Sequence, residues 1–278
     1  MRTVQATDIT KAVRSLFMRA NYTLPEDIRQ CLGECYTAET DKTAREMLGV
    51  ICENADIARE EQVPICQDTG MAVVFAEVGQ EVHIEGGLLR DAVNEGVRQA
   101  YRDGYLRKSV VGDPLERINT TDNTPAILYT ELVEGDQIRL YALPKGFGSE
   151  NMSRQKMFRP TASVEEIVDF VVETVRLAGG NPCPPLVIGI GIGGTFDYST
   201  VLSKKALLRE VGDHHPVYGD LEKQILDAVN RSGVGVQGLG KGVTALWAAV
   251  ETYATHIAGL PVAVNISCHV TRHASLKF

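Results

Sequence analysis

LVIGIGIGG, residues 186–194, is a strand-length run of apolar side chains broken by glycine. Such a run predicts a buried β-strand, because continuous apolar segments of this length are typical of strands in a core. Helical patterns lie on both sides of it. A capping box at Ser163 and Glu166 begins the preceding helix, and two further helices are expected at 196–210 and 218–232. The strand therefore belongs to a layered structure in which helices cover a sheet.

The remaining segments predict an α+β fold, with a helical N-terminal layer packed on a mixed β-sheet. The first 62 residues show helical patterns, and apolar side chains follow i, i+3, i+4 spacing from Asp41 onward. A further helix is expected at 88–103. Other strands are expected at 71–78, 126–133, 137–143, 244–256 and 260–269. The short polar turn Glu134-Gly135-Asp136 predicts a hairpin between the strands on either side of it.

The overall composition is that of an ordinary globular protein. Of 278 residues, 44% are hydrophobic and 23% are charged, and the formal net charge is −8. The negative charge argues against non-specific nucleic-acid binding, which needs a basic face. No segment approaches the roughly 20 apolar residues of a membrane span. The first residues, MRTVQATDITKAVRSLF, show no secretory signal. We therefore expect a cytoplasmic protein with reduced thiols and with no nucleic-acid or membrane partner.

The six cysteines fall into two groups by their setting. Cys31, Cys35 and Cys52 lie in predicted helices, where a cysteine is most often a buried apolar residue, although the spacing of four between the first two also permits a metal ligand pair. The other group, Cys66, Cys183 and Cys268, lies in loops or at strand ends. Prolines on both sides of Cys183 restrict its backbone, which suits a ligand held in a fixed direction.

Three isolated thiolates are compatible with an iron–sulfur cluster that has one open iron. An electron-transferring cluster normally has four cysteine ligands, and three leave a position for a substrate. An open iron can bind the carboxylate and hydroxyl of a small acid and help the hydroxyl to leave. Asp68 lies two residues after Cys66, where it could transfer a proton. The spacing of the cysteines is not by itself diagnostic of a cluster.

Five ordered motifs carry a resemblance to a known family. They are PICQDTG (64–70), LRKSVV (106–111), PKGFGSENMS (144–153), NPCPPLVIGIGIGGTFD (181–197) and THIAGLPVAVNISCH (255–269). In these motifs the sequence closely resembles the α subunit, or N-terminal half, of the class I (iron–sulfur) fumarate hydratases, the family that also includes L-tartrate dehydratase. The resemblance covers nearly the whole chain beyond about residue 40. It implies one domain, 1–278, made of a helical layer at 1–62 and a cluster-binding part at 63–278.

The resemblance also implies a set of site residues. A [4Fe–4S] cluster would be bound by the cysteines, and Asp68 would transfer a proton. Substrate-contacting residues of the family match Gln67, Arg107 and His256, and the glycine loop matches a backbone approach to the substrate at Gly146 and Gly148. The full set of implied ligands is Cys66, Cys183 and Cys268. Phe147 stands where family members often have glycine, which leaves open which backbone N–H of the loop points inward.

The implied reaction is the reversible dehydration of (S)-malate to fumarate, a step of the tricarboxylic acid cycle. LPKGFGSEN follows the fumarate hydratase pattern at the glycine loop and favours malate over L-tartrate, whose dehydration gives oxaloacetate. The chain ends ten residues after Cys268. We therefore expect a separate β subunit to complete the active site in a heterodimer or heterotetramer. A non-catalytic electron carrier or iron–sulfur scaffold is the alternative of a different class.

Several motifs also have plainer interpretations. Gly189 to Gly194 satisfies the glycine pattern of dinucleotide-binding folds, but no strand ending in an acid follows, and close strand–helix packing is the preferred explanation. His214-His215 is expected to be a solvated turn rather than a ligand pair. Arg154 and Lys156 are expected either at the start of a surface helix or at a subunit contact or a position that steers carboxylates. Arg107 alone would be a surface arginine, and Asp68 alone a turn residue before a glycine.

Overall fold

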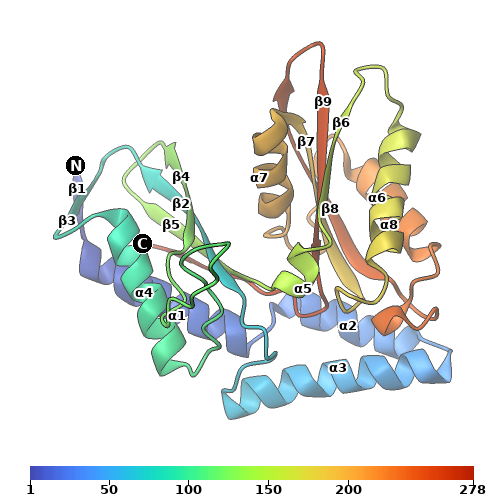
Figure 1. The fold of residues 1–278 in the computed structure, drawn as a ribbon, viewed down its shortest axis with the longest axis horizontal. Helices are drawn as coiled ribbons and strands as arrows, with labels where there is room; N and C mark the ends of the chain where they lie inside the picture. The colour runs from blue at the N-terminus through green and yellow to red at the C-terminus, as the bar shows by residue number, and fades with distance from the viewer. The chain divides into compact units, whose positions relative to one another are not determined.

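The structure is a computed structural model that describes residues 1–278, and the chain forms two compact units (Figure 1). Unit 1 contains Met1–Pro25, Ala55–Phe147 and Arg272–Phe278, and unit 2 contains Glu26–Asn54 and Gly148–Thr271. Each unit has helices on its own mixed sheet, so the α+β prediction is confirmed. None of the helices is both long enough and apolar enough to cross a membrane.

Unit 1 is built on a sheet with the strand order β10-β5-β2-β4. Its strands are β2 (Met71–Gly79), β4 (Ile127–Val133), β5 (Ile138–Lys145) and β10 (Ala274–Lys277), and a separate parallel pair joins β1 (Arg2–Gln5) to β3 (Val82–Glu85). The helices are α1 (Ala6–Tyr22) and α4 (Leu89–Asp103). Helix α1 packs on α4 and on β5, and the core between them includes the rings of Phe17 and Tyr101, 6.3 Å apart.

The predicted hairpin between β4 and β5 is wrong, because β2 lies between these two strands. Strand β2 pairs in parallel with β4 and antiparallel with β5. Seven of its nine residues are buried, whereas β4 has none, so the more apolar strand occupies the inner position. The turn around Gly135 instead closes over the end of β2, where the Gly135 carbonyl accepts the N–H of Glu81.

Unit 2 is built on a sheet with the strand order β6-β9-β7-β8. Its strands are β6 (Arg154–Phe158), β7 (Leu186–Gly194), β8 (Ala245–Thr255) and β9 (Leu260–Ser267). The other elements are α2 (Glu26–Ala38), α3 (Lys42–Glu61, in unit 2 as far as Asn54), α5 (Phe147–Glu150, in unit 2 from Gly148), α6 (Val164–Ala178), α7 (Phe196–Ala206), α8 (Gly219–Asn230) and the short helix η1 (Val236–Gly238). Helix α2 contacts β8. Arg154 and Lys156, expected to begin a helix, lie in β6.

Strand β7 is buried, as its sequence predicts, and both of its faces are covered. Ile188 and Ile190 join the core formed with α6 and α8, and the alternate residues Gly189 and Gly191 face α7 on the other side of the sheet (Figure 1). A Cβ atom on Gly189 would lie 2.0 Å from the Ser203 carbonyl oxygen. The glycine pattern therefore serves the close packing of α7 on β7, and the packing interpretation is confirmed.

Gly191→Ala is expected to destabilise the protein by about 3 kcal/mol or more, because overpacking forces a backbone shift. A Cβ at this position would lie 2.0 Å from the Ser199 carbonyl oxygen and 2.6 Å from the Ser203 nitrogen. Urea unfolding monitored by circular dichroism measures the change. Gly259→Ala is the matched control, since its Cβ would meet only the Met157 methyl at 3.9 Å. Equal stability of the two variants would contradict the packing argument.

His214-His215 is not the solvated turn that the sequence suggested. Glu222, a 1%-exposed residue of α8, accepts a hydrogen bond from the His215 N–H and lies 3.0 Å from His214 Nδ1. Its other oxygen accepts the Val250 N–H at 2.8 Å and the guanidinium of Arg209 at 3.3 Å. The buried carboxylate organises this segment because a buried charge requires several partners.

Glu222→Gln is expected to lower the free energy of unfolding by about 3 kcal/mol, because Glu222 is the fully buried carboxylate partner of Arg209. The two partners that remain, Asp213 and Glu251, are more exposed and lie farther from the guanidinium. Chemical denaturation of the variant measures the loss. Glu210→Gln, which neutralises an exposed glutamate in the same region, is the control and should change stability by less than about 0.5 kcal/mol. A small effect at both positions would mean that the buried ion pair contributes little.

Candidate functional site

The Asp68 carboxylate in unit 1 is held by two backbone donors. Its Oδ1 accepts the Gly70 N–H at 3.0 Å, and its Oδ2 accepts the Phe147 N–H at 2.9 Å. Gly70 has a φ of +77°, and a Cβ there would lie 2.7 Å from the Lys145 nitrogen, so the turn after Asp68 requires glycine. Asp68 is half-buried and its neighbour Gln67 is exposed. The acid is therefore fixed in direction while its loop stays accessible.

Three backbone carbonyls of the loop Asp68–Gly70 accept hydrogen bonds from side chains elsewhere in unit 1. The Arg272 guanidinium donates to the Asp68 carbonyl. The Tyr101 hydroxyl lies 2.6 Å from the Thr69 carbonyl oxygen and 2.9 Å from that of Gly70, and the Asn123 amide donates to Gly70 at 3.2 Å. Burial raises the pKa of Tyr101, so its hydroxyl remains a donor. No local pattern in the sequence links Arg272, Tyr101 or Asn123 to Asp68, so these roles could not be predicted.

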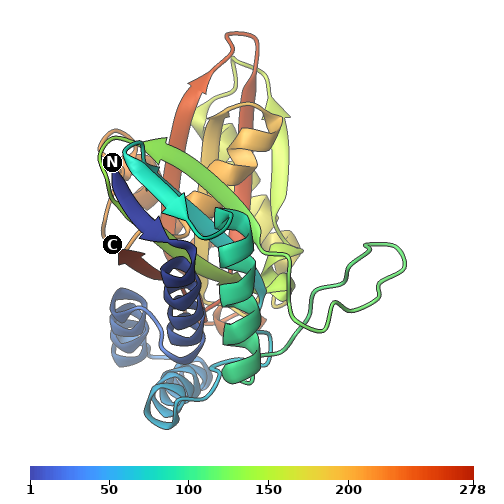
Figure 2. The same ribbon diagram turned by 90° about the vertical axis from the view of Figure 1, so that its left-hand side faces the viewer.

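Arg107 lies close to Asp68 through its backbone. The Thr69 hydroxyl donates to the Arg107 carbonyl at 3.1 Å, and the Asn123 side-chain oxygen accepts the Ser109 N–H at 2.7 Å. The Arg107 side chain is exposed and belongs to the long loop that projects after α4 (Figure 2). Unit 1 therefore places the Arg107 backbone beside the loop that carries Gln67 and Asp68.

The glycine loop approaches Asp68 through its backbone. A Cβ on Gly146 would lie 3.2 Å from Asp68 Oδ2, and the neighbouring N–H that points to this oxygen is that of Phe147. The Phe147 side chain is 47% exposed and does not fill the turn. The backbone N–H of this loop that meets Asp68 is therefore that of Phe147. Gly148 begins the next segment of unit 2 and is exposed.

Cys183 and Cys268 lie at one end of the unit 2 sheet. Cys183 precedes β7 and Cys268 follows β9, and these strands are antiparallel neighbours in which Val187 pairs with Ser267. The His269 N–H donates to the Cys183 carbonyl at 3.3 Å. Cys183 has a φ of +56° and is exposed, and Cys268 is half-buried. The two cysteines therefore lie at the same end of the unit 2 sheet.

His269 and Gln237 support the Cys183 loop, and neither was assigned a role from the sequence. His269 Nδ1 lies 2.8 Å from the Cys183 carbonyl, which accepts only, so this nitrogen carries the hydrogen. The Gln237 side chain donates to the Pro184 carbonyl at 2.7 Å, and its backbone N–H donates to the same oxygen at 2.9 Å. The position of His269 directly after Cys268 was the one available signal.

His256 lies at the opposite end of the unit 2 sheet from the two cysteines. It follows β8, whose last residue Thr255 pairs with Gly194 at the end of β7, whereas Cys183 precedes the start of β7. Nine residues of β7 span roughly 26 Å. His256 is exposed, and its Nδ1 accepts the Ala258 N–H at 3.1 Å. Unit 2 therefore does not bring His256 to Cys183 and Cys268.

The cysteines have the donor chemistry of an iron–sulfur site, since thiolates are the usual ligands of such clusters. Cys66 is a half-buried residue of unit 1, whereas Cys183 and Cys268 belong to unit 2. No group of three or more His, Cys, Asp or Glu side chains is gathered as a metal site in the structure. Within unit 2, Cys183 and Cys268 lie at the same end of two neighbouring strands with a fixed loop backbone, which fits two of the three ligands.

The cysteines assigned to the helices differ in burial. Cys52 is buried, as predicted, but Cys31 and Cys35 are half-buried neighbours on α2. The hydrogen bond between them raises the pKa of the Cys31 thiol, with burial as the second cause, and lowers that of Cys35. Their surroundings are those of a helix surface packed near β8, where Cys31 Sγ lies 4.0 Å from the Leu246 carbonyl oxygen.

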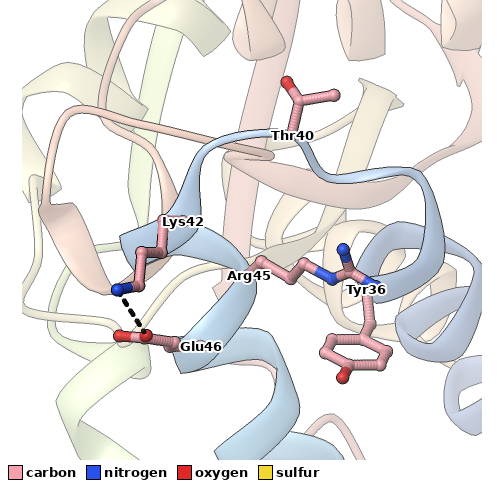
Figure 3. Close-up of a pocket in the computed structure, with 5 residues that line it drawn as sticks. All are labelled: Tyr36, Thr40, Lys42, Arg45 and Glu46. Carbon is pink, nitrogen blue, oxygen red and sulfur yellow. Dashed lines mark ion pairs between the residues drawn. The ribbon is translucent and has the colours of Figure 1, made fainter.

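A shallow pocket of about 360 Å³ lies at the turn between α2 and α3 (Figure 3). In it the Arg45 guanidinium lies 5.3 Å from the centre of the Tyr36 ring, and Lys42 is 3.9 Å from Glu46. Thr40 completes the lining. None of the residues that the sequence assigned to the site lines this pocket.

Comparison with known proteins identifies relatives along nearly the whole chain. The family model described as fumarate hydratase (Fumerase) matches residues 10–277. The putative L(+)-tartrate dehydratase subunit alpha of Methanocaldococcus jannaschii is 42% identical over 274 residues, which cover 96% of each chain. The L(+)-tartrate dehydratase subunit alpha of Escherichia coli K12 is 28% identical, with 96% of this chain and 90% of that protein covered.

Proposed function

Because the chain belongs to the fumarate hydratase family, we propose that it is the α subunit of a hydro-lyase that interconverts (S)-malate and fumarate. The observation that carries this proposal is the fixed Asp68 carboxylate, two residues after Cys66, held by the N–H groups of Gly70 and Phe147. A carboxylate fixed next to a cysteine ligand suits general acid–base catalysis on a small acid.

A [4Fe–4S] cluster is the proposed cofactor, with Cys66, Cys183 and Cys268 as its ligands. When bound, an iron with an open position would polarise the C–O bond of the substrate hydroxyl. Two observations support this assignment: thiolates are the usual ligands of such clusters, and Cys183 and Cys268 lie at the same end of the unit 2 sheet. The backbone N–H of Cys183 is already bonded to the Gly180 carbonyl, which holds the loop in place.

Each residue near Asp68 has a proposed task. In the dehydration direction, Asp68 donates a proton to the leaving hydroxyl. A second base removes the C3 proton, which completes the elimination of water. The exposed Arg107 guanidinium binds a substrate carboxylate through two parallel hydrogen bonds. The Gln67 side-chain amide donates a hydrogen bond to the substrate. The loop from Gly146 to Gly148 lets the backbone approach the substrate closely.

His256 is a proposed substrate contact in a site formed with another chain. It is exposed, and the length of β7 separates it from Cys183 and Cys268 within unit 2. Because Nδ1 accepts a backbone hydrogen bond, Nε2 carries the hydrogen in the neutral ring and is the atom that can donate to a carboxylate.

A separate β subunit is the proposed partner and supplies the second base. The support is that the relatives are named as α subunits. We expect the two chains to form a heterodimer or heterotetramer in the cytoplasm, and the α chain alone to be inactive.

The test is an anaerobic assay of the complex of α and β chains. We expect about four irons per α chain, water addition to fumarate, and loss of activity in air. The activity of the α chain alone is the control. An anaerobically reconstituted complex that carries no iron and converts neither malate nor L-tartrate would overturn the proposal.

L-Tartrate is the second candidate substrate, and the names of the relatives favour it. The sequence of the Gly146–Gly148 loop favours malate instead. Both substrates bring two carboxylates, so the chemistry near Asp68 is the same. A comparison of kcat/KM for the two acids on one preparation decides between them, and a larger value for tartrate would replace malate as the assignment.

A further inference from the structure

Two of the 28 lysines and arginines are buried, and both lie in unit 1 next to the loop Asp68–Gly70. Arg272 is 3% exposed, and Lys145 is 1% exposed with its backbone paired to Met71 in the strand that follows Gly70. Burying a cation is costly unless it is bonded. Arg272 is only partly bonded, because its Nε is buried without a hydrogen-bond partner. A residue retained at such a cost requires an explanation.

We propose that Arg272 is a positioning residue for Asp68, which it orients by binding the Asp68 carbonyl. This rests on the proposed function, in which Asp68 exchanges the proton. The guanidinium donates to this carbonyl from a position 204 residues further along the chain. The Asp68 side chain is meanwhile held by the Gly70 and Phe147 N–H groups. Both ends of the residue are therefore constrained.

The other two carbonyls of the loop explain why Arg272 acts on Asp68 in particular. Tyr101 and Asn123 bind the carbonyls of Thr69 and Gly70 and do not bind that of Asp68. Without Arg272, the Asp68 carbonyl would lose the hydrogen bond that it accepts from the guanidinium. The carboxylate could then rotate away from the Phe147 N–H while the rest of the loop stays in place.

Arg272→Met is expected to lower kcat of the complex about a hundredfold with less than a threefold change in KM, because a small misplacement of a catalytic group has effects of this size. Arg272→Lys keeps one donor and should recover part of the loss, to within about tenfold of the wild type. Arg19→Met is the matched control. The exposed Arg19 also donates to a backbone carbonyl of unit 1, that of Ser275 at 2.8 Å, and its replacement should leave kcat within twofold.

Hydrogen–deuterium exchange of the same complexes measures how well the backbone amides that bind Asp68 are protected, and it does not depend on activity. The amides of Gly70 and Phe147 should exchange faster in Arg272→Met than in the wild type and in Arg19→Met. A kcat within threefold of the wild type, or unchanged exchange of these amides, would overturn the proposal. A raised KM with unchanged kcat would also overturn it, since that pattern belongs to a direct substrate contact.

Failure of the proposed function is distinguishable from failure of this inference. If the wild-type complex converts neither acid but Arg272→Met still frees the two amides, the positioning role stands and the reaction is wrong. If Arg272→Met does not fold, Arg272→Gln takes its place in both measurements, because its side chain is two atoms shorter and cannot reach the Asp68 carbonyl as the guanidinium does. Wild-type kcat and wild-type exchange in the glutamine variant would then overturn the positioning role.

Discussion

Cys183→Ala in the αβ complex is expected to lose the cluster and to lower kcat/KM for malate on the order of a thousandfold, since the metal centre supplies several kcal/mol of stabilisation to the developing charge. The fold should persist, because Cys183 is exposed and alanine meets the same φ of +56° at similar cost. Iron content, visible absorbance and steady-state kinetics of the anaerobic complex measure the outcome.

Cys35→Ala is the matched control for the cysteine variant. Cys35 is a half-buried thiol on α2 that bonds Cys31 and has no proposed role in the cluster. We expect its variant to keep the full iron content and a kcat/KM within twofold. Retention of iron and activity in Cys183→Ala would remove Cys183 from the ligand set and with it the cluster assignment.

Asp68→Asn is expected to reduce kcat by about a thousandfold while the iron content stays unchanged, a loss within the range for general acid–base catalysts. Asparagine cannot take up or release the proton. It also turns an amide NH2 toward either the Gly70 or the Phe147 N–H, where the carboxylate accepts both. Steady-state kinetics and iron analysis on one preparation separate the chemical loss from loss of cofactor.

Asp91→Asn, which changes an exposed aspartate of α4 in the same unit, is the control and should leave kcat within twofold. If Asp68→Asn kept more than a tenth of the wild-type kcat, the proton-transferring group would have to be another residue. A thousandfold loss accompanied by loss of iron would instead show that Asp68 acts by holding the Cys66 loop.

Much of the secondary structure could be predicted because it depends on local spacing. The capping box at Ser163 and Glu166 begins α6 as expected, and the apolar run of β7 is a buried strand. The short strands were harder: β1, β3 and β10 have four residues each and too little pattern to recognise. Strand order also depends on which strand is buried most, and therefore the β4–β5 hairpin was predicted wrongly.

The candidate site shows the same division. The motif around Asp68 identifies the acid, its neighbour Gln67 and the glycine turn, because these residues are contiguous and their chemistry is local. Arg272 and Tyr101 could not be assigned, since they reach the loop from 204 and about 32 residues away. Such contacts arise only when distant segments fold together, and no local spacing records them.

By itself, the sequence therefore determined the α+β class, the family resemblance and the two sets of cysteines. It singled out Cys66, Cys183 and Cys268 by their loop settings, and these remain the proposed ligands. Only the tertiary structure decided that Cys183 and Cys268 lie at one end of the unit 2 sheet and His256 at the other. It also decided that Arg272 donates to the Asp68 carbonyl. The physical reason is that side-chain identity and short-range periodicity are local properties, whereas strand order and buried polar contacts depend on long-range packing.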